Sequence, residues 1–228
     1  MKPFTYSIYT VFLLLLFGGS QTSCKKFLHE KDPSNLSPQS YFTLPEHAEA
    51  GIAAAFSTTR FIGGGAGIFA NNFEMLDAVT GTTKTETGQN TDLNNLLGLA
   101  YNGDNVFVTN WWNGLYSVIA QTNLVLQQVP NINPMDAAQK KKILGEAQFL
   151  RGWAYFYLVR LFGDVPLITS PVDASSPNFL PTRTPAEQVY TQIVDDLTGA
   201  EGAGLPWAET TGRISLGAVK SLLAEVYL

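Results

Sequence analysis

Glu146–Ile168, EAQFLRGWAYFYLVRLFGDVPLI, is the stretch that decides the fold we predict for this chain. Its apolar residues recur at three and four positions, the spacing that places side chains on one face of an α-helix. Aromatic residues extend that face nearly around the helix, so we expect it to be buried on most sides. Gly163 can adopt the positive φ that ends a helix, and Pro166 prevents an immediate restart. The stretch predicts a long packing helix and carries no catalytic pattern.

Composition and charge exclude several classes of protein. Apolar residues make up 45% of the chain, which permits a sizeable hydrophobic core. The formal net charge is −5 at pH 7, whereas nucleic-acid binding needs a basic face, so we expect no nucleic-acid partner. The single cysteine, Cys24, excludes a disulfide framework and a cysteine metal site. His29 and His47 lie in different segments, and we predict neither a metal site nor a cofactor.

Residues 1–23 have the organisation of an export signal. Their apolar core, VFLLLLF at 11–17, is shorter than the roughly 20 apolar residues that span a bilayer, which favours a signal peptide over a membrane span. Cys24 follows directly, as in a bacterial lipoprotein signal, although Gln21 stands where an aliphatic residue is usual. We expect Cys24 to be lipidated and to anchor the chain. The alternative is an ordinary cleaved signal with an incidental free cysteine.

The rest of the chain is predicted to be mainly α-helical. Residues 24–40 form a tether, and 41–228 form one helical domain. We expect helices at Pro45–Arg60, Asn105–Val129, from Pro134 to Phe162, at 185–200, and from Leu216 onward, with caps at Thr43, Asn133, Thr184 and Gly212–Ser215. Short connections make helix hairpins, which suggests a tetratricopeptide-like repeat. The last helix has no stop signal before Leu228, so we expect an N-terminal portion of a longer protein.

The segment 61–105 interrupts this pattern. It is rich in glycine, asparagine and threonine and has little periodicity, apart from a short helix that we expect near Asn71–Val79. Such a long loop inside a compact domain is usually functional or disordered. The predicted fold class is therefore an α-helical scaffold of tetratricopeptide-like hairpins with a long, loop-rich insertion.

Several segments of this sequence resemble segments of the SusD/RagB family. The run Phe149–Ile168 is similar to its signature Leu-Arg-Ala-x-x-Tyr-Phe motif and the following Gly-x-Val-Pro-Leu, with Gly152 in place of the usual alanine. Trp112-x3-Tyr116-x6-Asn123 and Gly212-Arg213-Ile214 also resemble family segments. The resemblance implies an outer-membrane, surface-exposed lipoprotein of Bacteroidetes that functions in nutrient uptake. It implies a glycan or peptide ligand and a SusC-like TonB-dependent transporter as partner.

Loops carry the ligand residues in this family, including the loop before the Trp112 helix. Sugars bind to flat aromatic faces and to amide or acidic groups. Tyr101 is the only aromatic residue in 81–105, and Asn94 and Asn95 precede it. We expect these three residues and Trp207, in the later Leu-Pro-Trp loop, to be glycan contacts. The alternative for Tyr101 is packing of the loop, and Trp207 is compatible with either role.

Two residues of the long helices are expected to have packing roles. We expect Trp112 to pack in the core, and Arg151 to pair with an acid on a neighbouring helix.

Enzyme interpretations are weaker. The glycine run at 65–67 lacks the strand and helix of a dinucleotide site, there is no Gly-x-Ser-x-Gly elbow, and Asp195 and Asp196 point apart. We therefore predict no enzyme. A helical-repeat scaffold that binds only protein partners is the main alternative, and an exported hydrolase is the other.

Overall fold

The computed structural model describes residues 37–64, 71–84, 90–176 and 179–228. The predicted signal peptide, Cys24 and most of the predicted tether lie outside these residues. Regular structure in the described part is helical, apart from isolated bridge residues, among which Val165 and Thr184 form an antiparallel bridge. The predicted mainly α-helical class is confirmed.

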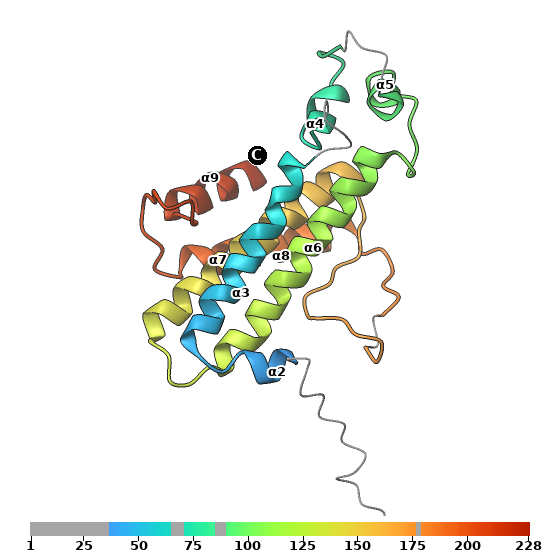
Figure 1. Cartoon of the computed structure of the whole chain (residues 1–228). Helices are drawn as coiled ribbons and strands as arrows, with labels where there is room; N and C mark the ends of the chain where they lie inside the picture. The colour runs from blue at the N-terminus through green and yellow to red at the C-terminus, as the bar shows by residue number, and fades with distance from the viewer. Residues whose placement is uncertain (1–36, 65–70, 85–89, 177–178) are drawn as a thin grey trace, which may run out of the picture. The chain divides into compact units, whose positions relative to one another are not determined.

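Figure 1 shows four long helices of this part, α3, α6, α7 and α8, with the shorter α4 and α5 beyond the ends of α3 and α6. In chain order the elements are α2 (Pro38–Tyr41), α3 (Pro45–Thr58), η1 (Thr59–Gly63), α4 (Glu74–Ala78), α5 (Thr91–Leu97), α6 (Val106–Gln128), η2 (Val129–Asn131), α7 (Ala137–Phe162), α8 (Ala186–Glu201) and α9 (Leu216–Val226). Helix α2 begins within the predicted tether.

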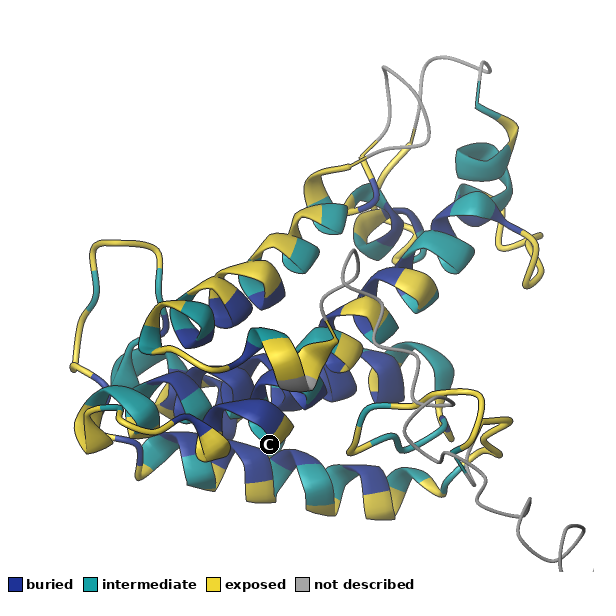
Figure 2. Ribbon diagram, turned by 60° about the horizontal axis from the view of Figure 1, so that its bottom comes forward, coloured by how far each residue is buried: buried dark blue, intermediate teal, exposed yellow. Residues whose placement is uncertain are grey.

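Helix α7 is the centre of the packing, and it contacts α3, α6, α8 and α9. Its aromatic half is buried as predicted, with Tyr155 and Leu158 fully enclosed. Gly163 ends it with a φ of +69°. Figure 2 shows the buried residues along the inner faces of the long helices. The stretch that predicted the fold therefore lies in the core.

Glycines let α7 approach α8 closely. A Cβ added to Gly145 would overlap the Cβ of Ala203, and one on Gly152 would lie 3.2 Å from Leu197 Cγ. Both glycines are in the helix interior, where glycine costs about 1 kcal/mol relative to alanine. The close helix contact offsets that cost, because each missing methyl group leaves room for the neighbouring chain.

A buried ion pair joins α6, α7 and α8. Arg151 donates from Nε and Nη2 to the carboxylate of Asp196, at 2.8 and 2.7 Å, and from Nη1 to Asn123 Oδ1 at 2.8 Å. Burial raises the pKa of Asp196, and the hydrogen bonds from Arg151 oppose that shift. The predicted pairing of Arg151 with an acid on a neighbouring helix is confirmed. Asp195, one position away, lies at the surface groove described below.

A second ion-pair cluster joins α3 and α7 to the segment before α9. Arg213 donates to Glu49 Oε2 at 2.6 Å and, through Nε, to Glu146 Oε1 at 2.9 Å, with a still closer contact from Nη2 to Glu146. Gln139 donates to the other oxygen of Glu49 at 2.9 Å. The Glu146 side chain has no exposed surface, so its charge depends on Arg213.

Several helix starts differ from the predicted caps. Helix α7 begins at Ala137 because Asp136, rather than Asn133, accepts a hydrogen bond from Gln139 N at 2.8 Å. Helix α3 begins after Leu44, whose N–H donates to His47 Nδ1 at 3.3 Å, and not after Thr43. Only the predicted cap at Ser215 is confirmed in place, since its Oγ accepts from Ala218 N at 3.1 Å.

The first turn of α8 is hydrogen-bonded to Asp164, which lies just after the end of α7. Asp164 Oδ1 accepts a hydrogen bond from Ala186 N at 2.9 Å, and Pro185 occupies the cap position. The predicted capping box from Thr184 is therefore wrong, because a carboxylate distant in sequence binds the first free amide. Thr184 instead pairs with Val165 through the bridge, its N–H donating at 3.0 Å.

The two neighbouring tryptophans of α6 have different roles. Trp111 is 1% exposed, and its indole N–H donates to Asn72 O at 2.7 Å, which ties α6 to the segment before α4. Trp112 is half-buried and packs edge-on against Phe162 at 5.1 Å. Trp112 does contact the core as predicted, but Trp111 is the more deeply buried of the pair.

Candidate functional site

A polar pocket lies where α5, the turn after it and the start of α6 meet. It encloses about 200 Å³, and its lining residues are Asp92, Asn95, Ala100, Tyr101, Asn102 and Asn105. Pockets for drug-sized ligands are roughly 300–1,000 Å³. This pocket is smaller, so it would enclose one unit of a chain-like ligand rather than the whole molecule.

Asn105 builds the floor of the pocket. It is 3% exposed and caps α6, with Oδ1 accepting from Phe107 N at 3.1 Å. Its Nδ2 donates to the Asp92 carbonyl at 2.9 Å, which ties the first turn of α5 to the first turn of α6. Its backbone N–H donates to Asn102 O at 3.2 Å. Because these groups are all engaged, Asn105 positions the pocket and leaves ligand contact to its neighbours.

The chain reverses sharply after α5. Leu99 adopts a φ of +52°, a conformation that disfavours a side chain, and its N–H donates to Leu96 O at 3.0 Å. Ala100 N donates to Asn95 O at 2.8 Å, which completes a Schellman-type helix end. This turn brings Ala100 and Tyr101 back beside α5. Leu99 itself is 65% exposed, so no packing of its side chain explains the strained backbone.

Three polar side chains of the pocket are available to a ligand. The Asp92 carboxylate, the Asn95 amide and the Tyr101 hydroxyl have no hydrogen-bond partner among the described residues. Asn102 uses its Oδ1 to accept from Asp104 N at 3.0 Å. The Tyr101 ring is 44% exposed. Together they offer acceptors, amide donors and an accessible aromatic surface.

The structure brings together some of the predicted contacts and separates others. Tyr101 and Asn95 line the same pocket, whereas Asn94 is a neighbour on α5 outside the lining. Trp207 is 67% exposed in the α8–α9 connection and does not line the pocket. Sequence reasoning missed Asp92 and assigned no role to Asn105. Asn105 could have been recognised from the sequence, because asparagine is a favoured N-cap residue and it directly precedes the apolar periodicity of α6.

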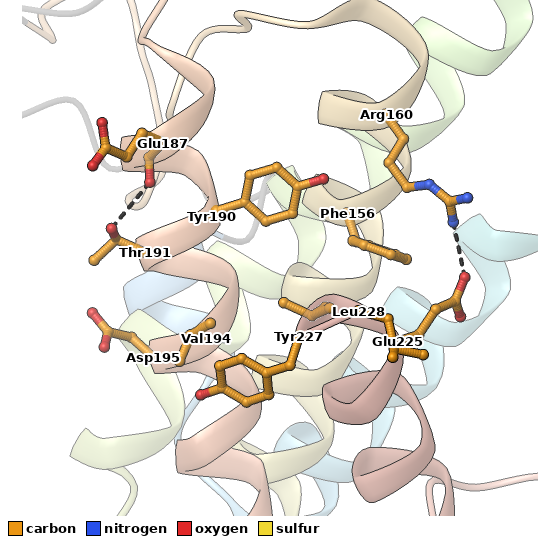
Figure 3. Close-up of a pocket in the computed structure, with 11 residues that line it drawn as sticks. Phe156, Arg160, Glu187, Tyr190, Thr191, Val194, Asp195, Glu225, Tyr227 and Leu228 are labelled. Carbon is orange, nitrogen blue, oxygen red and sulfur yellow. Dashed lines mark hydrogen bonds and ion pairs between the residues drawn. The ribbon is translucent and has the colours of Figure 1, made fainter.

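A larger groove lies between α7, α8 and the end of α9. Figure 3 shows Tyr190 and Tyr227 on opposite walls, with Arg160 bonded to Glu225 at 2.8 Å. It encloses about 830 Å³, and Arg160 stacks 4.9 Å above the Phe156 ring. Residues 226–228 form part of its wall. Nothing in the described residues indicates what covers this face, so we assign it no ligand.

The described residues lack both the ligand cluster of a metal site and the long apolar helix of a membrane span. Among them, no group of three or more His, Cys, Asp or Glu side chains is placed to hold a metal ion. His47 stacks on the Tyr41 ring at 4.5 Å and bonds to the start of α3. None of the helices in this part of the chain combines the length and apolar character needed to cross a bilayer.

The described residues form a helical framework with an open polar pocket beside α5 and the start of α6. Residues 26–228 match the SusD-like family described as "Starch-binding associating with outer membrane". The chain belongs to this family.

Comparisons with individual proteins agree in both sequence and structure. SusD-like protein P38 of Formosa agariphila is 28% identical over 201 residues, covering 88% of this chain and 38% of the relative. A SusD superfamily protein from Parabacteroides distasonis superposes with a TM-score of 0.75 at 34% identity, covering 80% of this chain and 39% of that one. A laminarin-binding SusD-like protein gives 0.70 at 30% identity, covering 81% and 40%. The chain therefore spans about two fifths of the length of these proteins.

Proposed function

We propose that the protein is a cell-surface lipoprotein that binds a glycan and passes it to a SusC-like TonB-dependent transporter in the outer membrane. In this proposal the protein leaves the glycan chemically unchanged. The observation that supports the proposal is the pocket lined by Asp92, Asn95 and Tyr101, whose side-chain polar groups have no partner among the described residues and lie beside an exposed ring. The laminarin-binding relative supports a glycan as the ligand class.

The chemistry of the pocket suits a sugar. Sugar hydroxyls both donate and accept hydrogen bonds, so a complementary site needs both functions. The Asp92 carboxylate can accept from two adjacent hydroxyls, and the Asn95 amide can donate and accept at once. The C–H face of a sugar ring is apolar and suits the flat surface of Tyr101. One sugar unit can therefore satisfy these groups without any covalent step.

The anchor and the transporter are the finer parts of the proposal. We assign lipidation to Cys24, which lies outside the described residues, because it follows a signal-like apolar core. Several acyl chains make membrane attachment stable. Membership of a family described as outer-membrane associated supports this location, and the transporter partner follows from the family resemblance.

Calorimetric titration of the purified full-length protein with a panel of polysaccharides tests the binding function. We expect Tyr101→Ala to weaken binding at least tenfold, equal to about 1.4 kcal/mol. Phe179→Ala is a matched control, because it removes an exposed aromatic residue that does not line the pocket and that we do not predict to contact the glycan. An equal loss of glycan affinity in the two variants would show that the binding site does not lie at Tyr101.

The other two interpretations give different results in the same experiment. A protein that binds no glycan and no peptide would support the scaffold that binds only protein partners. Release of reducing sugar over time would indicate a hydrolase. Sustained binding without release of sugar supports a capture protein.

A further inference from the structure

The charge distribution around the pocket indicates which kind of glycan it accepts. We propose that the pocket selects uncharged glycans and discriminates against those that carry sulfate or carboxylate groups. This inference rests on the proposed glycan-binding function and specifies its ligand class. It is based on the side chains that line the pocket and on the charged residues of the insertion, 61–105, to which they belong.

The described part of the lining contains an acid and no base. Asp92 supplies the one carboxylate among these residues, and the other polar ones are three asparagines and Tyr101. A bound sulfate or uronate needs a cation or a set of amide donors to replace the water it loses. Within the described residues no Lys or Arg lines the pocket, so an anionic substituent there would meet the Asp92 carboxylate without a balancing side-chain charge.

The rest of the insertion strengthens this negative character. The described residues 71–84 and 90–105 contain four acids, Glu74, Asp77, Asp92 and Asp104, and one base, Lys84, a net charge of 1 − 4 = −3. Lys84 is exposed at the end of the segment that follows α4 and is not a lining residue. An approaching polyanion would therefore meet a surface of like charge before it reached the pocket.

Helix ends do not reverse this balance. The start of α6 contributes partial positive charge, but Asn105 Oδ1 already accepts from Phe107 N there. The end of α5 contributes partial negative charge on the same side of the pocket, because Ala100 directly follows its closing turn. The two contributions oppose each other, and the side-chain charge of Asp92 determines the sign.

In a site that is partly shielded from water, a carboxylate and a sulfate a few ångströms apart repel each other. The repulsion energy is large enough to lower the affinity more than tenfold. We therefore expect at least a tenfold preference for an uncharged glycan over its charged derivative. Because the cause is electrostatic, added salt should reduce the preference.

The test uses purified full-length protein and neutral polysaccharides, each paired with its chemically sulfated derivative. An acetylated derivative with the same degree of substitution serves as control, since it blocks the same hydroxyls without adding charge. Affinities are measured by titration at low and at high NaCl. We expect sulfation to weaken Tyr101-dependent binding at least tenfold more than acetylation does, with a smaller difference at high salt.

Asp92→Asn separates charge from shape. In this variant the affinities for the sulfated and acetylated derivatives should differ less, because the substitution removes the repelling carboxylate and keeps the size of the side chain. Sulfated glycans that bind as tightly as neutral ones, and in a Tyr101-dependent way, would overturn the charge selection and leave the glycan-binding function standing. Absence of Tyr101-dependent binding to every member of the panel would overturn both.

Discussion

Replacing Arg213 with methionine should destabilise the protein more than the loss of any surface ion pair. Arg213 is the cation that contacts both Glu49 and the fully buried Glu146. Methionine keeps much of the apolar volume of the side chain and removes its charge. Glu146 would then be a carboxylate in the core without a partner. Removing one member of a buried pair costs about 3–5 kcal/mol, and the 27% exposure of the Arg213 side chain places our expectation near 3 kcal/mol.

The loss should depend on pH. Burial raises the pKa of Glu146 even with Arg213 opposing the shift, and without Arg213 the pKa rises further. A folded-state pKa above the unfolded value means that stability falls as pH rises through that interval. Burial alone would raise the pKa of Glu49, but hydrogen bonds from Gln139 and Arg213 outweigh it and lower that pKa. Glu49 therefore stabilises the native protein above its unfolded pKa, and the variant loses the part that comes from Arg213 as pH rises. The destabilisation should be small near pH 4 and complete at pH 7.

Urea unfolding at both pH values measures this difference. Arg160→Met is the matched control, because the Arg160–Glu225 pair has side chains that are 52% and 56% exposed. It should cost about 1 kcal/mol, including the stacking of Arg160 on Phe156. Adding Glu146→Leu to Arg213→Met should recover at least half of the loss. Equal effects of the two arginine substitutions, or no change with pH, would refute the argument.

Three further predictions concern packing and the pocket. Gly145→Ala should cost about 1–2 kcal/mol of unfolding free energy despite better helix propensity, because its Cβ overlaps Ala203; an unchanged urea midpoint would contradict this. Leu99→Gly should raise stability by about 0.5–1 kcal/mol in thermal unfolding by relieving the positive φ, and a loss would show that the side chain is needed. Asn105→Ala should cost about 1–3 kcal/mol, since Phe107 N and the Asp92 carbonyl lose their partner; Asn105→Asp, which keeps the cap, should cost less.

The long helices could be predicted because their signals are local. Apolar periodicity and Gly163 determined the course of α7 and its end without any tertiary information. The pairing of Arg151 could also be predicted, since a charged side chain in an aromatic helix requires a partner. Its identity, Asp196, depends on how α8 packs against α7, and that contact spans 45 residues.

The pocket was only partly predictable because its parts are joined by distant contacts. Tyr101 and Asn95 were found from their chemistry in a loop before a helix. Helix α5 was missed, since it is only seven residues long and lies within a glycine- and asparagine-rich segment. Asp92 is tied to the start of α6 by the bond from Asn105 to its carbonyl, 13 residues away. The turn at Leu99 gave no glycine signal, because the sequence places a leucine where glycine is usual.

The uneven burial of the described residues has a consequence for motion. Helix α7 contacts α3, α6, α8 and α9, so its amides can exchange with solvent only when most of the bundle opens. The fully buried core residues of helices α4 and α5 are Met75, Ala78 and Leu96. The candidate pocket lies beside these less buried helices, and we expect this part to open separately from the bundle. A bound sugar that joins α5 to the start of α6 would slow hydrogen exchange there and leave the rate in α7 unchanged.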